Sequence, residues 1–400
     1  MSNTILTPTA VTREALRILH QKLNFVGSIN RQYDDSFAKS GAKIGDSLKI
    51  RLPNQYTVRS GAVLNVQNTS ETSTTLQIAT QKGVDLNFSS AELTLSLDDF
   101  SKRIIEPAMA VLAANIESDA MSMYKDIYYQ ANQSTITQAL SLTTLLGGKA
   151  KLDKALAPSG DRVANLAIQN TVDLVDALKT LFNDPVAITK QYREGIMGRT
   201  AGFDFYQNSL WSQHTSGTET ASGTITVNQS GATGSTVTVT NGSSKTLKKG
   251  DIITFVGCNR CHPETKADTG EKQQFVLTAD VATNGTTLNI SPSIVTSGAT
   301  QNVTASPTNS QAITKVGGAS GIMDISMLYH PDAFTFATAD LMMPKGVDFS
   351  AREVQDGISL RIVRAYDINN DAFPCRLDVL YGYKTIRAEL ACRTASNSTA

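Results

Sequence analysis

The residues whose spacing most resembles a reactive site are Cys258, Cys261 and His262, in the sequence Cys-Asn-Arg-Cys-His. Cys-x-x-Cys-His is the pattern that attaches c-type haem: the two thiols bond the vinyl groups and the histidine binds the iron. The same two cysteines could form half of a zinc site. The residues that could complete four zinc ligands are His262, Cys375, Cys392 and His330. A third interpretation is two small, partly buried thiols beside a turn.

Three observations argue against haem. The N-terminal sequence MSNTILTPTAVTREALRILH has no basic segment followed by an apolar one, so we expect no secretory signal and no export route for haem attachment. The sequence around the motif is rich in threonine and has little apolar volume for a porphyrin. The other histidines, His20, His214 and His330, offer no obvious second axial ligand.

Zinc and enzymatic chemistry are also disfavoured. The additional zinc ligands lie outside this segment or lack a paired spacing, and four cysteines in 400 residues make no disulfide scaffold. We therefore expect reduced thiols, no metal and no cofactor, with Cys258, Cys261 and His262 as the candidates if a metal binds. The chain has no phosphate-loop, dinucleotide-binding, zinc-protease or nucleophile-elbow motif, so we expect it not to be an enzyme.

The composition favours a protein that contacts itself. The 36 lysines and arginines balance 36 aspartates and glutamates, and charged residues are only 18% of the chain. Little repulsion therefore opposes association between copies. Zero net charge argues against a dedicated nucleic-acid binder. No apolar run reaches the roughly 18 residues that span a bilayer, so we expect no membrane partner.

The first half of the chain alternates between strand and helix patterns. Apolar residues at helical spacing predict a helix over 9–24, and alternation predicts half-buried strands at 46–52 and 76–88. The connection between these strands includes a polar stretch, 66–75, and makes a long hairpin that needs another surface. A long helical pattern covers 98–130, in which Pro107 either kinks the helix or begins a second one. A shorter amphipathic helix is expected over 171–182, within a mixed region 135–214.

At about His214 the composition changes to threonine, serine, glycine and asparagine. Short alternating segments follow at 224–227, 236–240, 251–256, 273–279 and 287–291, with turn residues between them. This spacing predicts an antiparallel β-sandwich or barrel, inserted into a host domain. Alternation resumes at 358–364 and 376–382, and we expect these strands to pair with strands of 135–214.

The order of these parts, with four sequence blocks, resembles a known family. The blocks are NFVGSINRQYDDSFAKSGAKIGDSLKIRLPNQY (24–56), LTLSLDDFSKRIIEPAMAVLAANIE (93–117), YREGIMGRTAGFDFYQNS (192–209) and MPKGVDFSAREVQDGISLRIVRAYDINNDAFPCRLDVLYG (343–382). LKKGDIITFVG (247–257) and GEKQQFV (270–276) match within the inserted segment. The chain is similar to major capsid proteins of tailed bacteriophages, and more narrowly to the podovirus coat-protein family with an inserted immunoglobulin-like domain.

The resemblance implies an α+β, Hong-Kong-97-type capsid fold. Its parts would be an N-arm (1–43), an extended hairpin loop (44–90), a peripheral domain with the spine helix (91–134), an axial domain (135–214 and 321–400) and an inserted all-β immunoglobulin-like domain (215–320). It implies a shell of hexamers and pentamers that encloses double-stranded DNA without sequence-specific contacts. A scaffolding protein and a portal protein would be partners, with assembly in the host bacterial cytoplasm before the protein resides in the virion capsid.

Two other functions remain open from the residues alone. One is the subunit of a non-viral compartment that encloses a cargo enzyme, and the other is a β-rich metal or haem protein that uses Cys258, Cys261 and His262. For the capsid function, we expect charged residues of the hairpin and the long helix to contact neighbouring subunits. These residues are Arg51, Arg59, Glu71, Lys82, Lys102 and Arg103. We also expect that deleting residues 60–74 leaves a folded subunit that assembles poorly.

Overall fold

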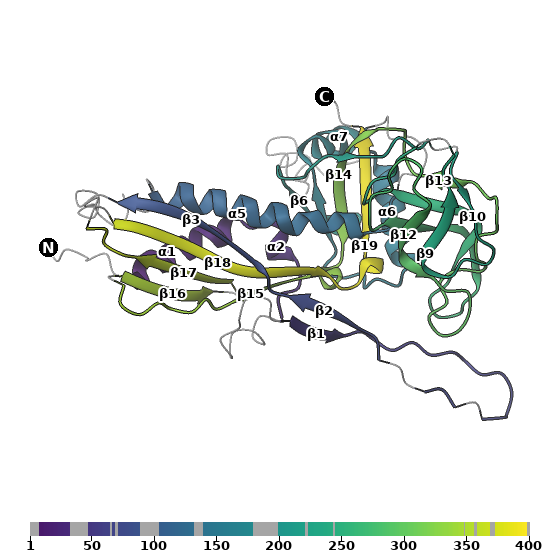
Figure 1. Ribbon diagram of the computed structural model, residues 1–400, viewed down its shortest axis with the longest axis horizontal. Coiled ribbons are helices and arrows are strands. Elements are labelled where there is room, and N and C mark those ends of the chain that lie inside the picture. Colours follow the sequence, from purple (N-terminus) through teal and green to yellow (C-terminus); the bar gives the residue numbers. More distant parts are fainter. Residues whose placement is uncertain are drawn as a thin grey trace. The chain divides into compact units, whose positions relative to one another are not determined.

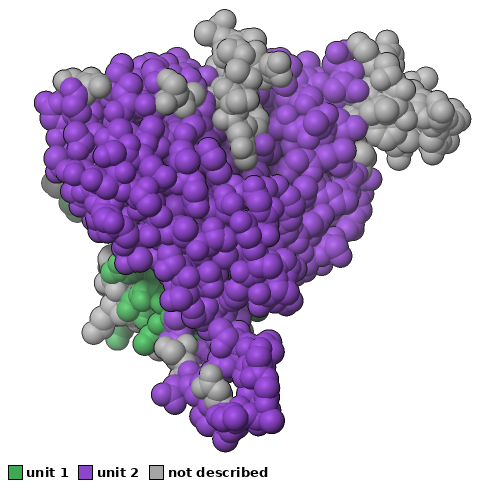
Figure 2. All heavy atoms as spheres, turned by 90° about the vertical axis from the view of Figure 1, so that its right-hand side faces the viewer, with its two compact units in different colours: residues 1–51, 73–121, 334–386 green, residues 52–72, 122–333, 387–400 purple. Residues whose placement is uncertain are grey.

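The computed structural model describes residues 8–32, 47–64, 66–68, 71–88, 104–131, 139–178, 199–220, 223–242, 245–347, 349–355, 358–368 and 373–397. The chain forms two compact units, each built from separate stretches of sequence. Unit 1 contains residues 1–51, 73–121 and 334–386, and unit 2 contains 52–72, 122–333 and 387–400 (Figure 2). Among the helices that the structure describes, none is long and apolar enough to cross a membrane.

The helices of unit 1 are α1 (Pro8–Lys22), α2 (Phe25–Ser28) and α5 (Glu106–Met121). The helix expected over 9–24 is confirmed as α1, and its predicted apolar face is buried. Pro107 is the second residue of α5, so it begins this helix, where its missing N–H would have no partner in any case. The expected long helix ends early: α5 stops at Met121, a 3₁₀ segment η3 (Ser122–Asp126) follows, and Val111 is exposed rather than buried.

One antiparallel sheet forms the centre of unit 1. Its strands are β3 (Thr80–Phe88), β15 (Phe334–Ala339), β16 (Phe349–Gln355), β17 (Ile358–Arg364) and β18 (Phe373–Thr385). The long strand β18 pairs with β3 along one edge and with β17 and then β15 along the other. Helix α1 packs on β16 and β17, and α5 packs on α1 and β3, so both helices cover the sheet (Figure 1).

Strands β17 and β18 confirm the two strands predicted at 358–364 and 376–382, but their predicted pairing is wrong. Both strands pair within unit 1 and not with strands of 135–214. Alternation shows that a segment has one buried face, but it carries no information about which strand lies beside it. The sheet partner that the sequence did not indicate is β3.

A two-stranded ribbon, β1 (Ser47–Arg51) and β2 (Ser73–Gln77), belongs to the same unit. The segment expected as one strand over 76–88 is divided between β2 and β3, and part of the expected polar connection is strand β2. The ribbon is anchored by an apolar cluster with β15 and β18. Its members are Ile50, Leu76, Ile78, Ala337, Ala339, Leu341 and Leu380.

Unit 2 contains a mixed sheet with the strand order β19-β14-β4-β6-β5. These strands are β4 (Val163–Leu166), β5 (Arg199–Thr200), β6 (Phe203–Gln207), β14 (Ile322–Tyr329) and β19 (Ala391–Asn397), and β7 (His214–Thr215) also pairs with β14. Helix α6 (Leu142–Lys154) packs on β14 and β19, and α7 (Ile168–Leu178) on β14. Helix α7 begins three residues earlier than expected and confirms residues 171–178 of the helix expected over 171–182. Residues 179–182 lie outside the described residues. Two short 3₁₀ turns, η4 (Pro331–Ala333) and η5 (Ala388–Leu390), complete the unit.

The threonine-rich segment forms an all-β body, as predicted. Its strands are β8 (Thr226–Val227), β9 (Gly234–Thr240), β10 (Ile252–Cys261), β11 (Asp268–Leu277), β12 (Thr287–Ile294) and β13 (Ile313–Lys315), in the sheet order β13-β10-β11-β12-β9-β8. Main-chain hydrogen bonds of 2.8–3.0 Å between 225–227 and 310–313 join β8 to the segment before β13. The sheet therefore closes into a barrel (β8 to β13) around one apolar core that includes Phe255 and Phe275.

Candidate assembly surfaces

The extended loop, residues 52–72, joins β1 to β2, and a few hydrogen bonds cross-link its two arms among the residues that the structure describes. The N–H of Leu52 donates to the Thr72 carbonyl at 2.9 Å and continues the ribbon by one step. The amide of Gln67 then binds both main-chain groups of Thr57, which keeps the two arms together. At the turn, Gly61 has a φ of +91°, a conformation that glycine adopts without strain.

Apolar side chains line this loop and are exposed to solvent. Val58 and Val63 are 95% and 83% exposed. The exposed apolar residues of the loop are Tyr56, Val58, Val63, Leu64 and Val66. A run of exposed apolar side chains on a segment without a core marks a contact surface. The polar stretch of this connection hid its apolar residues at the level of the sequence, although Tyr56 and Val58 already show the alternation of a strand.

The predicted contact residues lie in different environments. On the ribbon and loop, Arg51 and Glu71 are exposed, while the guanidinium of Arg59 donates to the carbonyls of Gly61 and Val63 in its own loop. Lys82 on β3 forms an ion pair of 2.7 Å with Asp119 on α5. The residues Lys102 and Arg103 lie outside the described part of the chain. A role in contacts between subunits remains a prediction for all six residues.

Asp119 also holds the long strand β18 to the helix. The hydroxyl of Tyr381 donates to the Asp119 carboxylate at 2.5 Å. Burial, followed by the hydrogen bond to Asp119, raises the pKa of Tyr381 well above its usual range. Lys82 therefore already has a partner within its own subunit, and this contact joins sheet and helix in unit 1.

The Cys-x-x-Cys-His segment ends β10 and forms part of the barrel wall. Cys258 is buried in the barrel core, donates to the carbonyl of Ala305 at 3.0 Å, and has its pKa raised by burial to about 12. Cys261 is also buried, but it is not part of that core cluster. The Nδ1 atom of His262 accepts main-chain N–H groups of Glu264 and Thr265 at 3.3 and 3.2 Å. Thiols of raised pKa are poor metal ligands, because the thiolate binds the metal. In the described part of the chain, no group of three or more histidines, cysteines and acidic residues could hold a metal.

These contacts give a direct prediction for chelation. Adding excess ethylenediaminetetraacetate should leave the melting temperature unchanged, because nothing in the arrangement of Cys258, Cys261 and His262 depends on a metal. Differential scanning calorimetry with and without chelator, together with metal analysis of the purified protein, tests this. A chelator-dependent drop in melting temperature, or a haem absorption band, would instead support the metal or haem function.

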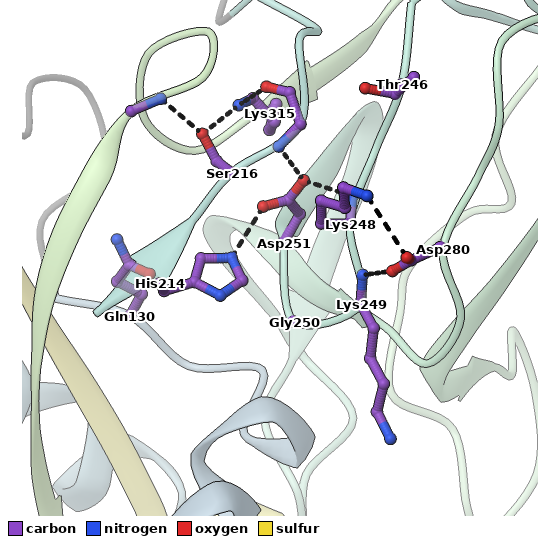
Figure 3. Close-up of polar contacts among 12 residues, drawn as sticks. Gln130, His214, Ser216, Thr246, Lys248, Lys249, Gly250, Asp251, Asp280 and Lys315 are labelled. Atoms are coloured by element: carbon purple, nitrogen blue, oxygen red, sulfur yellow. Dashed lines mark hydrogen bonds and ion pairs between the residues drawn. The ribbon is translucent and has the colours of Figure 1, made fainter. Parts of the chain in front are cut away.

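The chain enters and leaves the barrel through a buried polar cluster centred on Asp251, at the start of β10. Its Oδ1 lies 3.0 Å from Nε2 of His214, and its Oδ2 accepts the N–H groups of Gly217 at 3.0 Å and Lys248 at 2.8 Å (Figure 3). Burial alone raises the pKa of Asp251, but the hydrogen bonds from His214 and the two amides outweigh it and lower that pKa. Asp251 is therefore an ionised acceptor that fixes the entering segment 214–217.

His214 fits this cluster in its neutral form. Because Asp251 accepts at Nε2, the Nδ1 atom is free to accept from the Tyr124 hydroxyl at 3.3 Å. Burial lowers the pKa of His214 more than the bond to Asp251 raises it, and the nearby charge of Arg393 lowers it further. The ring is therefore neutral near pH 7 and joins η3 to the barrel.

A buried lysine holds the segment that leaves the barrel. Lys315 ends β13, and its Nζ donates to Ser216 Oγ at 2.9 Å, the Gly318 carbonyl at 2.7 Å and the Gly217 carbonyl at 3.1 Å (Figure 3). Ser216 in turn donates to Gly318 and accepts from the N–H of Gly321. A serine beside a lysine can act as a nucleophile, but this hydroxyl is buried and fully hydrogen-bonded. The pair is therefore structural.

Three more side chains connect the barrel to the rest of unit 2. The side chain of Gln274 pairs with both main-chain groups of Gln130, at 3.0 and 3.1 Å. Arg393 on β19, which is fully buried, donates to Gln130 Oε1 at 2.9 Å and to the carbonyl of Gly250. Arg260 lies 4.8 Å from the ring centre of Tyr129. Nothing in the sequence pattern pointed to these residues, because their partners are 130 or more positions away.

Comparison with known proteins identifies the family of the chain. Residues 28–393 match the family described as P22 coat protein, gene protein 5. The chain belongs to the P22 coat protein family. It is thus a phage major capsid protein, a subunit of the homo-oligomeric shell of the virion.

Solved structures give further similarities. The CUS-3 coat protein I-domain is 32% identical, with 94% of that chain and 23% of this chain covered and a TM-score of 0.19. A chain from Mycobacterium phage Che8 is 12% identical, with 93% of this chain and 90% of that chain covered and a TM-score of 0.49. The capsid of Ralstonia phage GP4 is 6% identical, with 95% and 92% covered and a TM-score of 0.46. No curated protein matches the sequence.

Proposed function

We propose that the extended loop binds a neighbouring subunit of the shell through its exposed apolar side chains. The observation that carries this proposal is the row of exposed apolar side chains on a loop that has no core of its own. Water contact with these side chains is unfavourable, and a neighbouring copy of the chain is the partner that a shell always supplies. The contact residues predicted from the sequence, among them Arg51 and Glu71, flank this apolar row.

We also propose the finer assignments of the capsid function. Unit 1 would be the peripheral part of the subunit. Unit 2, apart from the extended loop and the barrel, would be the axial part that carries the barrel. Residues 334–386 would then belong to the peripheral part and not to the expected axial domain. Support comes from the strand pairs of unit 1: β18 pairs with β15 and also with β3. Subunits would form hexamers and pentamers in the bacterial cytoplasm with a scaffolding protein and a portal, and enclose double-stranded DNA. The chain would have no enzymatic activity, in keeping with its lack of catalytic motifs.

Substitutions in the loop test this proposal. Replacing Val58 and Leu64 by serine should leave the free subunit as stable as the wild type, because both side chains are exposed in it. Each lost apolar contact should cost about 1 kcal/mol at the interface, so the concentration needed for assembly should rise by about thirty-fold for the pair. Sedimentation velocity and electron microscopy of assembled particles measure this concentration.

The matched control keeps the apolar character: Val58→Ile with Leu64→Met should assemble like the wild type. A stronger variant replaces residues 58–66 by Asn-Gly, which joins Thr57 to Gln67 through a tight turn. This variant replaces the deletion of 60–74, which would remove the first residues of β2. Normal shells from the shortened loop would contradict the proposal.

A further inference from the structure

Glu117 is a buried carboxyl group in unit 1 whose partners are main-chain amides of a distant segment. It lies on α5 and has no solvent exposure. The N–H of Phe25 lies 2.8 and 3.2 Å from its two carboxyl oxygens, and the N–H of Val26 lies 3.4 Å from Oε2. One side chain therefore ties the N-terminal segment 24–26 to the long helix, across 92 positions of sequence.

No described cation neutralises this carboxyl group. Helix α5 packs against α1, α2 and β3. The charged groups of these elements whose side chains are described are Arg13, Glu14 and Arg17 on α1, Lys82 and Asp85 on β3, and Glu106 and Asp119 on α5. The cations have other partners: Arg13 pairs with Glu353, Arg17 with Glu14, and Lys82 with Asp119. Among the described residues, only main-chain N–H groups would thus stabilise the charge of an ionised Glu117.

The chain beyond this point is anchored independently of Glu117. The N–H of Asn30 donates to the Phe334 carbonyl at 3.3 Å, and its carbonyl accepts the N–H of Phe336 at 3.1 Å. Between the two attachments lies Gly27, where an added Cβ would meet nothing within 4 Å. Separation of segment 24–26 from α5 would leave these bonds of Asn30 intact. It would expose the buried side chains of Phe25 and Val26, so the open state is a minor one.

We propose that Glu117 and the amides of 24–26 form a proton-dependent clasp. In the closed state the carboxyl group keeps its proton. Loss of that proton favours an open state in which segment 24–26 leaves α5 and water solvates the carboxylate. The driving force is the cost of an unpaired charge in the interior, which the main-chain hydrogen bonds reduce but do not remove.

The pH range of this clasp follows from the two states. Burial raises the pKa of Glu117 to about 7, against the opposing effect of the amides, whereas a solvated glutamate has a pKa of about 4.5. Between these values the closed state holds a proton that the open state has released, so closure is favoured at low pH and opening increases as pH rises. The opening constant should rise roughly 70-fold from about pH 5 to about pH 8, mostly below pH 7.

The consequence for assembly rests on the proposed function: near neutral pH the N-terminal segment of a free subunit would be available to rearrange. The clasp itself is a property of the isolated chain. If the loop variants fail to affect assembly, the proposed function is wrong but the clasp is not. If the exchange experiment below contradicts the clasp, the proposed role of the loop is not affected.

Amide hydrogen exchange of the full-length chain tests the clasp. Exchange of the Phe25 and Val26 amides, corrected for the pH dependence of intrinsic exchange, should accelerate by the stated factor between about pH 5 and pH 8. The amide of Phe336, bound to Asn30, provides an internal reference and should show no such change. Glu117→Gln, which keeps an acceptor but cannot ionise, should abolish the pH dependence, and the exposed Glu106→Gln on the same helix should preserve it.

A pH-independent exchange of Phe25 and Val26 in the wild type overturns the proposal, and so does an unchanged pH dependence in Glu117→Gln. If that variant fails to fold, difference infrared spectroscopy of the wild type gives the decision. The band of a protonated, buried carboxylic acid should disappear as pH rises through about 7. A spectrum without such a band near pH 5 overturns the proposal as well.

Discussion

Asp251→Ala should destabilise unit 2 by about 4 kcal/mol or more, since removing one member of a buried ion cluster typically costs 3–5 kcal/mol. The variant leaves Lys315 and Arg393 buried without this counter-charge. It also removes the acceptor of the Gly217 and Lys248 amides, and each unsatisfied buried amide adds a cost of about 1–3 kcal/mol. Such a loss is a large fraction of the roughly 5–15 kcal/mol by which a domain is stable.

Urea unfolding followed by circular dichroism measures this effect, and Asp280→Ala is the matched control. Asp280 is also a carboxylate of the barrel, and it contacts the N–H of Lys249 and the ammonium of Lys248. It is largely exposed, so its removal should change the free energy of unfolding by less than about 1 kcal/mol. Equal effects of the two substitutions would show that burial of Asp251 does not matter.

The effect of Asp251→Ala should also depend on pH. The pKa of Asp251 is lowered in the folded state, so its contribution is present above the ordinary value of 3.8 and is lost as pH falls below it. The stability difference between wild type and variant should therefore narrow as the solution is acidified through this range. A constant difference down to low pH would mean that the carboxylate charge is not what stabilises the junction.

Gly382→Ala should destabilise unit 1 by about 3 kcal/mol or more, because overpacking against rigid main chain exceeds the usual cost of an added methyl group. Gly382 lies on β18 where β2 passes over it. A Cβ there would lie 2.2 Å from the Gln77 carbonyl oxygen and 3.0 Å from the Cα of Ile78. Both are main-chain atoms, so no side-chain rotation relieves the clash, and the ribbon β1–β2 has to move.

The comparison substitution is Gly147→Ala, in the interior of helix α6. A Cβ at Gly147 meets nothing within 4 Å. Alanine has the higher helix propensity, so this variant should gain about 0.5–1 kcal/mol. Thermal unfolding should thus shift in opposite directions for the two substitutions. A neutral Gly382→Ala would indicate that the ribbon is not held against β18 in solution.

Local patterns in the sequence determined the type of most elements. The apolar spacing of 9–24 gave helix α1 with its buried face, and the alternation of 236–240 and 287–291 gave strands β9 and β12. The order of the parts along the chain and the four sequence blocks pointed to the coat-protein family, and the balanced, low charge and the lack of catalytic motifs were in keeping with it. These features were accessible because helix and strand periods are properties of neighbouring residues.

Only the tertiary structure decided which segments meet. The sequence predicted strands at 358–364 and 376–382 but gave them the wrong partners, since β3 is almost 300 positions from Phe373. The long helix ended at Met121, where a 3₁₀ segment follows, although the apolar spacing continued beyond that residue. The motif at Cys258 had a specific spacing, yet its thiol lies in an apolar core that keeps it protonated.

The two buried carboxyl groups show this limit most clearly. In the sequence, Asp251 and Glu117 are ordinary acidic residues beside a turn and within a helix. Their roles depend on amides brought to them by the fold, Gly217 for Asp251 and Phe25 for Glu117. Periodicity is encoded locally, whereas the burial of a carboxyl group and the supply of its hydrogen-bond partners depend on contacts between distant parts of the chain, which is why the structure was needed to find them.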